Sequence, residues 1–227
     1  MNIDPKEPTS NLRDRLVLSK GHASAALYAV LAERGYLAKS QLKTFRKLGS
    51  NLQGHPDMEK ILGIDMSTGS LGQGLSVANG MALASKMDGL GCRIYCILGD
   101  GEIEEGQIWE AAMTANKYKL DNLCIILDNN GLQIDGKIEE VAGLTNIEGK
   151  FSNFGLKVIN VDGHNIPNLI DAFDTAKQTK GVPTIIIAKT IKGKGVSFME
   201  GKAEWHGKAP KQEEYEKAIE ELRRGVE

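Results

Sequence analysis

The second half of the sequence alternates short apolar segments with longer amphipathic ones, and this alternation limits the possible folds more than any other feature. Apolar segments of strand type occupy residues 93–98, 123–127, 156–161 and 184–188. Strands that are apolar on both faces are typical of a parallel sheet covered by helices on each side. The sequence therefore predicts an α/β fold, a parallel sheet with helices on both faces, with residues 1–227 forming one domain.

The segments between and before these strands supply the predicted helices. Helical composition and periodicity indicate helices over residues 23–34, 104–118, 166–179 and 212–224. The helix at 104–118 has acidic residues in its first turn, which suits the helix dipole. A further helix is predicted over 40–48, and another begins in the glycine-rich stretch 69–74 and runs to about Met87. Residues 135–153 are predicted to be a loop.

Composition excludes several classes of protein. The chain carries 28 Lys and Arg against 30 Asp and Glu, so it lacks the basic excess of a general nucleic-acid-binding protein. No apolar run approaches the roughly 20 residues that cross a bilayer, and the polar N-terminus does not resemble a signal peptide. The three cysteines lie in apolar runs, as reduced core cysteines do. We therefore expect a cytoplasmic protein that binds neither nucleic acid nor membrane.

Two neighbouring predicted strands end in motifs that suit metal and phosphate binding. The triplet GDG at 99–101 ends the first strand, NNG at 129–131 ends the second, and 27 residues separate the triplets. That interval fits one helix and one strand, so Asp100 and Asn130 are expected at the same edge of the sheet. A carboxylate and an amide oxygen suit Mg²⁺, which takes its other ligands from phosphate and water. Gly101 leaves room for that phosphate near backbone amides. Each triplet alone would be read as a turn.

GDG, 27 residues and NN together resemble the thiamine-diphosphate-binding signature. The surrounding segments resemble transketolases, in the same order: RDRLVLSKGHASAALYAVL, LGSNLQGHP, STGSLGQGLSVANGMALA, GDGEIEEGQIWEAAM, LDNNGLQIDG and WHGKAP. The chain is similar to the first, diphosphate-binding domain of a transketolase, as found on its own chain in split-gene members. The resemblance implies the thiamine-diphosphate-binding fold, with thiamine diphosphate and Mg²⁺ (or Ca²⁺ or Mn²⁺) as cofactors.

The resemblance also implies which residues hold the cofactor and its metal ion. Asp100, Asn130 and the backbone carbonyl of Leu132 match the family's metal ligands, and Asn130 also belongs to the cofactor site. Gly101 matches the glycine whose amide meets the diphosphate. Lys192 resembles a lysine that reaches the diphosphate in mammalian-type members. The segment that packs on the aminopyrimidine ring corresponds here to Gly69, Ser70 and Leu71.

Three of the four histidines lie in loops bordered by glycine. His22 and His206 match histidines that lie between the diphosphate and the substrate, and His55 matches one near the ketol end of the substrate. Histidine suits proton transfer near neutral pH. Glu105 matches an acid at the subunit interface that couples the two active sites. His164 is interpreted as a turn residue without a function.

The resemblance further implies that part of the enzyme lies on another polypeptide. A complete transketolase also has pyrimidine-binding and C-terminal domains, and the pyrimidine domain carries the glutamate that activates the cofactor; only 21 residues follow His206 here. Family members also carry several dozen residues before the NIDP segment, including a substrate-facing histidine that this sequence lacks. We therefore expect a partner chain with a pyrimidine domain, in a homodimer or a heterotetramer, and no activity from this chain alone.

Three functions are compatible with the sequence. The first is transfer of a two-carbon ketol unit between sugar phosphates, the transketolase reaction of the pentose phosphate pathway, once the chain is paired. The second is another thiamine-diphosphate enzyme, a deoxyxylulose-phosphate synthase or half of a 2-oxoacid dehydrogenase E1, which the WHG and GHP motifs disfavour. The third is a non-catalytic module that only holds the diphosphate. Activity reconstituted with a partner chain would eliminate the third.

Overall fold

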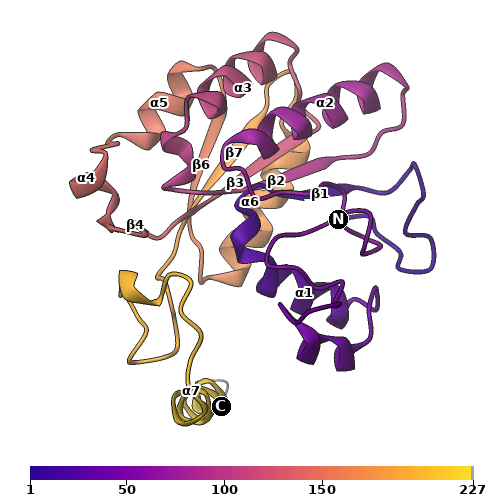
Figure 1. Cartoon of the computed structure of the whole chain (residues 1–227). Helices are drawn as coiled ribbons and strands as arrows, with labels where there is room; N and C mark the ends of the chain where they lie inside the picture. The colour runs from indigo at the N-terminus through magenta and orange to yellow at the C-terminus, as the bar shows by residue number, and fades with distance from the viewer. Residues whose placement is uncertain (226–227) are drawn as a thin grey trace.

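The computed structural model describes residues 1–225 and has a central sheet of five parallel strands (Figure 1). Along the sheet the strands lie in the order β1-β2-β3-β7-β6. Their bounds are Arg15–Leu18 (β1), Ile94–Gly99 (β2), Leu123–Asn129 (β3), Lys157–Asp162 (β6) and Thr184–Lys189 (β7). The predicted α/β class is confirmed. Because Gly99 is paired with Asp128, β2 and β3 end side by side, as the spacing of their terminal motifs predicts.

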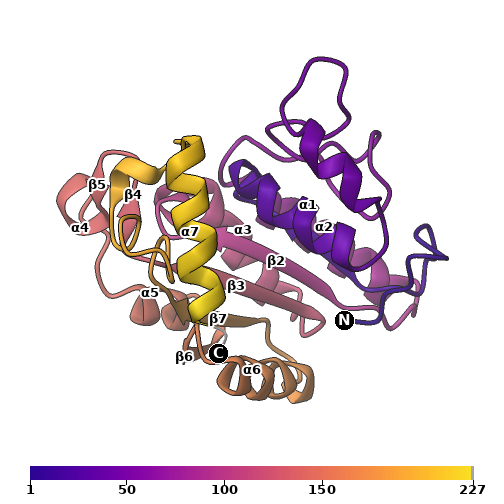
Figure 2. The ribbon, with the colours of Figure 1, turned by 90° about the horizontal axis from the view of Figure 1, so that it is seen from below.

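Helices lie on both sides of this sheet (Figures 1 and 2). On one side are α2 (Gln73–Met87), α3 (Gly106–Lys117) and α5 (Ile147–Asn153), and on the other are α1 (Ser24–Glu33) and α6 (Ile166–Gln178). The main core fills the space between the sheet and the first group. Its fully buried side chains include Leu75, Ile94, Leu98, Ile108, Leu123 and Ile125.

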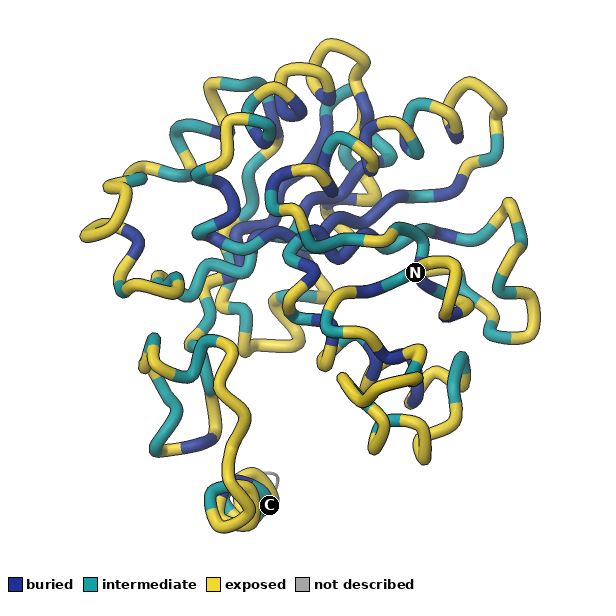
Figure 3. Tube along the Cα trace, viewed as in Figure 1, coloured by how far each residue is buried: buried dark blue, intermediate teal, exposed yellow. Residues whose placement is uncertain are grey.

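A smaller core lies under α6, where Ala172 and Ala176 are buried against Tyr95, Cys124 and Ile186 of the strands. The two alanines are four residues apart and share one helix face, so α6 packs closely on the sheet. Figure 3 shows the result, with the strands forming the most continuously buried part of the chain. Apolar strands covered on both faces are what the sequence pattern predicts.

A third cluster of buried hydrophobic side chains lies beside α1, and in this region one predicted helix is wrong. Residues 40–48 do not form an α-helix; a 3₁₀ turn, η2, spans Lys39–Thr44 instead. Arg46 takes a positive φ of 58°, which a right-handed helix excludes. Its N–H donates to the carbonyl of Leu52 at 2.9 Å. Leu48 is fully exposed, because no second element covers the end of this segment.

Three other expectations need correction. Strand β1 is absent from the predicted elements, because it is only four residues long, follows two charged residues and begins with a third. Helix α3 begins at Gly106, so of the acids expected in its first turn Glu104 lies in a separate 3₁₀ turn, η3 (Glu102–Glu104), and Glu105 is the N-cap of α3. The predicted loop 135–153 contains a short strand and short helices. They are β5 (Gly136–Lys137), which pairs with β4 (Leu132–Gln133), and then α4 (Ile138–Val141) and α5.

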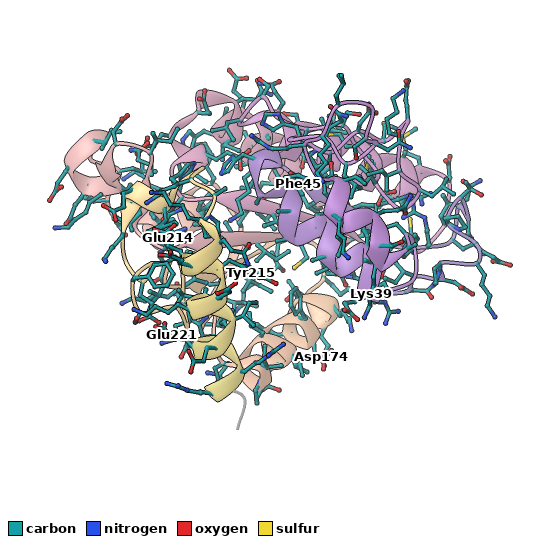
Figure 4. All side chains as sticks on the ribbon, turned by 60° about the horizontal axis from the view of Figure 1, so that its bottom comes forward. Lys39, Phe45, Asp174, Glu214, Tyr215 and Glu221 are labelled. Atoms are coloured by element: carbon teal, nitrogen blue, oxygen red, sulfur yellow. The ribbon has the colours of Figure 1, made fainter. Side chains whose placement is uncertain are left out.

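After β7 the chain forms a strap, residues 190–207, and then the predicted C-terminal helix α7 (Gln212–Arg224). The strap contains a short 3₁₀ turn, η4 (Ala203–Trp205), and another, η1 (Gly21–Ala23), precedes α1. Figure 4 shows Tyr215 and Glu221 on α7, which is set apart from α6. Glu221 accepts hydrogen bonds from the N–H of Ser197 at 2.6 Å and from its hydroxyl at 2.8 Å, so α7 is tied to the strap. None of the helices within residues 1–225 has the length and apolar character to span a membrane.

Candidate functional site

A cavity of about 660 Å³ opens where β1, β2 and β3 end, and the strap covers part of it. This is the edge of an open α/β sheet at which ligands bind, beyond the carboxyl ends of the strands. Most of the residues singled out from the sequence share its wall. They are His22, Gly69, Leu71, Asp100, Gly101, Asn130, Leu132, Lys192 and His206.

The predicted metal ligands lie together at the ends of β2 and β3. The buried Asp100 carboxylate accepts hydrogen bonds from the amides of Gly101, at 3.0 Å, and Gly131. The side-chain oxygen of Asn130 accepts from the N–H of Leu132 at 3.0 Å. Burial raises the pKa of the Asp100 carboxyl despite these hydrogen bonds, a change that a bound cation would oppose.

These oxygen donors fit a hard cation that is also coordinated by the phosphate groups of a bound molecule. Within residues 1–225 no group of three His, Cys, Asp or Glu side chains is arranged to hold a metal ion. One carboxylate, one amide oxygen and one backbone carbonyl leave positions for phosphate oxygens and water, as Mg²⁺ prefers. The metal-ligand role of Asp100, Asn130 and Leu132 stays a prediction that their placement favours.

His22, in the loop after β1, and Lys192 and His206, in the strap, are potential cations that face the cavity. The rings of His22 and His206 have their centroids 5.0 Å apart, and Lys192 Nζ lies 3.3 Å from His206 Nδ1. Burial and repulsion from His206 and the nearby lysines lower the pKa of His22 to about 4. Burial and neighbouring lysines also lower the pKa of His206 and of Lys192. Gathering these groups disfavours their charged forms, and an anion such as a diphosphate would relieve the repulsion.

The cavity wall also holds an ion pair that the sequence motifs did not single out. Lys20, at the end of β1, pairs with Asp128 of β3, whose other oxygen accepts from the Thr190 hydroxyl. Burial alone would raise the pKa of the Asp128 carboxyl, but the Lys20 charge and these hydrogen bonds lower it. Lys20 lies two residues before His22 and Asp128 two before Asn130, so their closeness to motif residues was the available signal.

His164 also lines the cavity, although its place in the sequence indicates only a turn. Its Nε2 accepts a hydrogen bond from the N–H of Ile191 at 2.8 Å, which fixes the start of the strap next to Lys192. The available signal was its Gly-His pair directly after the predicted strand 156–161. We therefore interpret His164 as a residue that orients the strap.

Three of the predicted residues lie outside the cavity wall. The His55 ring packs against Gly69, where a methyl group would come within 3.1 Å of it, so this histidine borders the cavity. Ser70 is exposed beside it. Glu105 is exposed at the start of α3, in front of Gly72. Their roles, including that of Glu105 at a subunit interface, stay predictions.

Comparisons with known proteins identify relatives of this chain. A family model described as "Transketolase, thiamine diphosphate binding domain" matches residues 1–225. The 6-deoxy-6-sulfo-D-fructose transketolase subunit SqwG of Clostridium sp. (strain MSTE9) is 50% identical over 222 residues, which cover 98% of this chain and 81% of that protein. An apulose-4-phosphate transketolase subunit of Phocaeicola vulgatus is 44% identical over 227 residues, covering 100% of this chain and 80% of that protein.

A solved structure shows the same relationship in three dimensions. The transketolase of Campylobacter jejuni matches with a TM-score of 0.92 and 38% sequence identity, over 98% of this chain and 36% of that chain. The sequence motifs, the fold and the position of the cavity thus lead to one family. This chain belongs to the transketolases and is their N-terminal, thiamine diphosphate-binding domain.

Proposed function

We propose that this chain is the diphosphate-binding subunit of a split transketolase, which transfers a two-carbon ketol unit between sugar phosphates when paired with a pyrimidine-domain chain. One observation carries the proposal: a carboxylate–amide pair, Asp100 and Asn130, shares a cavity with His22, His206 and Lys192, whose pKa values are lowered by burial and by nearby cations. Two relatives named as transketolase subunits support a separate partner chain, since this chain covers about four fifths of each.

In this proposal the chain's residues bind and orient the cofactor. Asp100, Asn130 and the Leu132 carbonyl would hold Mg²⁺, and the Gly101 amide and Lys192 would bind the diphosphate. When bound, thiamine diphosphate supplies the carbanion-stabilising chemistry of ketol transfer, and the protein supplies orientation and proton transfer. Burial and the neighbouring cations lower the pKa of His22 to about 4, so its imidazole is neutral at pH 7 and can donate or accept a hydrogen bond.

The substrates are proposed to be sugars that carry an anionic group. Relatives are named for 6-deoxy-6-sulfo-D-fructose and apulose-4-phosphate, a sulfonated and a phosphorylated sugar. A panel of phosphorylated and sulfonated ketoses, with 2-oxoacids included, would identify the donor. Turnover of a 2-oxoacid in place of every ketose would favour the alternative 2-oxoacid dehydrogenase class.

The test uses the complex of this chain with a pyrimidine-domain partner recovered from lysate of its source cells in the presence of thiamine diphosphate and Mg²⁺. Asp100→Ala should weaken Mg²⁺-dependent cofactor binding by at least about 100-fold, because it removes a metal ligand. Asp121→Ala is the matched control, since Asp121 also accepts a backbone N–H, from Gly181 at 2.9 Å, but precedes β3 at the opposite end. Full ketol transfer by the Asp100 variant would refute the proposal, and recovery of this chain without a partner would support the non-catalytic alternative.

A further inference from the structure

A buried carboxylate in the cavity wall has no part in the function proposed above. Glu102 directly follows the GDG triplet, begins η3 and is only 2% exposed. Burying a charged group is costly unless hydrogen bonds replace its lost water. Glu102 accepts three: from the hydroxyl of Ser19, from the N–H of Gly72 at 3.0 Å, and from the N–H of Gly99 at 3.1 Å.

The three donors belong to three separate segments of the chain. Ser19 follows β1, Gly72 precedes α2, and Gly99 ends β2. The hydrogen bonds from Ser19 and Gly72 span 83 and 30 residues of sequence. One side chain therefore joins segments that local structure alone would not hold in register.

Each donor lies in the cavity wall or next to a residue of it. Ser19 precedes Lys20, Gly72 follows Leu71, and Gly99 lines the cavity itself. Hydrogen bonds to an ionised acceptor are shorter and stronger than neutral ones. A small movement of any of these segments would displace a cavity-lining group, so the position of the Glu102 carboxylate sets the geometry of the wall.

A second buried carboxylate allows comparison. Asp14, 7% exposed, accepts the N–H of Asn2 at 2.6 Å and that of Arg93 at 2.8 Å. It also links the first two strands, but at their starting ends, away from the cavity. Asp14 and Glu102 thus make the same kind of contact at opposite ends of the sheet, and only Glu102 reaches the site.

We propose that Glu102 is a positioning residue for the cofactor cavity, which holds the His22 loop, the Leu71 segment and Asp100 in one arrangement. The inference rests on the proposed function, because thiamine diphosphate is the ligand that this arrangement serves. Glu102 is itself part of the cavity wall, but its three hydrogen bonds all join it to the chain, so it acts through the three segments that it holds.

The test compares Glu102→Gln, Glu102→Ala and Asp14→Asn in the complex with the partner chain. The glutamine amide keeps one acceptor oxygen, so the hydrogen bond from Gly99 is lost and that from Gly72 is kept. We expect cofactor binding about 10-fold weaker for Glu102→Gln and about 100-fold weaker for Glu102→Ala, the range for groups that orient metal ligands. Asp14→Asn should lower the melting temperature and leave the affinity within about twofold.

Amide hydrogen exchange supplies a readout that needs no cofactor. In the full chain, Glu102→Gln should speed exchange at Gly99, whereas Asp14→Asn should speed it at Arg93. Folded Glu102 variants with wild-type exchange at Gly99 and Gly72, or with wild-type cofactor affinity, would overturn the inference. If the wild-type complex bound no thiamine diphosphate, the proposed function would fail, and the exchange data would still decide whether Glu102 holds these segments. If Glu102→Ala does not fold, Glu102→Gln carries the test.

Discussion

The ion pair between Lys20 and Asp128 allows a quantitative test of the electrostatics of the cavity. The Lys20 side chain is 14% exposed and that of Asp128 is 29% exposed, so the pair is shielded from water but not sealed. Breaking a fully buried pair costs about 3–5 kcal/mol, whereas exposed pairs contribute about 0.2–1 kcal/mol. For Lys20→Met we expect an intermediate loss of about 2 kcal/mol in the free energy of unfolding.

A double-mutant cycle isolates the pair itself. Lys20→Met, Asp128→Asn and the double variant are compared by urea unfolding at pH 7, and the coupling energy should be about 1–2 kcal/mol. The exposed pair Lys137–Glu140, with side chains 59% and 63% exposed, is the matched control. Its coupling should stay below about 0.5 kcal/mol. A Lys20–Asp128 coupling no larger than that of the control would refute the reasoning.

The coupling should also depend on pH in a fixed direction. The folded pKa of Asp128 is lower than its usual value, so the carboxylate contributes stability that is fully present above its unfolded pKa of about 3.9. That contribution is lost as the pH falls through the folded pKa, because both states then bind the proton. The penalty for Lys20→Met should therefore shrink below about pH 4. A penalty that grew in acid would contradict the assignment of Asp128 as the ionised partner.

Two further predictions concern His22 and Gly72. The folded pKa of His22, about 4, lies below the ordinary histidine value of 6.5, so its contribution to stability should be lost as the pH falls from 6.5 toward 4. In the complex at pH 6, binding of thiamine diphosphate should be accompanied by the uptake of part of a proton, measured by calorimetry in two buffers. The His22→Gln variant should take up less. Equal uptake by the variant and the wild type would contradict the argument that an anion restores the charge of His22. Gly72 has a φ of +81°, and a methyl group there would lie 2.8 Å from Glu105 Cβ. Gly72→Ala should therefore destabilise the chain by about 1–3 kcal/mol, whereas Gly80→Ala, in open space within α2, should stabilise it by up to about 1 kcal/mol.

The elements that could be predicted from sequence are those in which consecutive residues are apolar and buried. β2, β3 and β7 consist almost entirely of buried apolar side chains, so their patterns are unambiguous. β1 is a four-residue edge strand with two half-buried residues, and its pattern carries too little information. Residues 40–48 show a helical face, but the positive φ of Arg46 and the hydrogen bond to Leu52 depend on tertiary contacts that periodicity does not contain.

The residues of the candidate site likewise fall into those that local sequence predicts and those that it does not. Asp100 and Asn130 could be predicted to lie together because adjacent parallel strands fix the register of their ends. Asp128 lies 108 residues from its partner Lys20, and Ser19, one of the three donors to Glu102, lies 83 residues from it. No local spacing indicates such pairings. A turn explains the position of His164 in the sequence equally well, and only its hydrogen bond to the strap distinguishes the two roles.

The distribution of charge in the cavity is hard to explain by stability alone. Asp100 follows β2 and Asp128 lies near the end of β3, whereas the cations come mainly from the β1 loop and the strap. Among the lining cations in the described chain, only Lys20 has a carboxylate partner within salt-bridge distance. His22, His206 and Lys192 instead have lowered pKa values, first because they are buried and second because nearby cations repel their charged forms, so the ligand-free fold disfavours these charges. Sequences depart from local consistency of this kind mainly at functional sites. A ligand with a cation at one end and an anion surrounding it would satisfy both groups at once, and a magnesium diphosphate has that form. The placement of these acids and cations therefore favours a ligand of the kind that thiamine diphosphate, the cofactor of the family, provides.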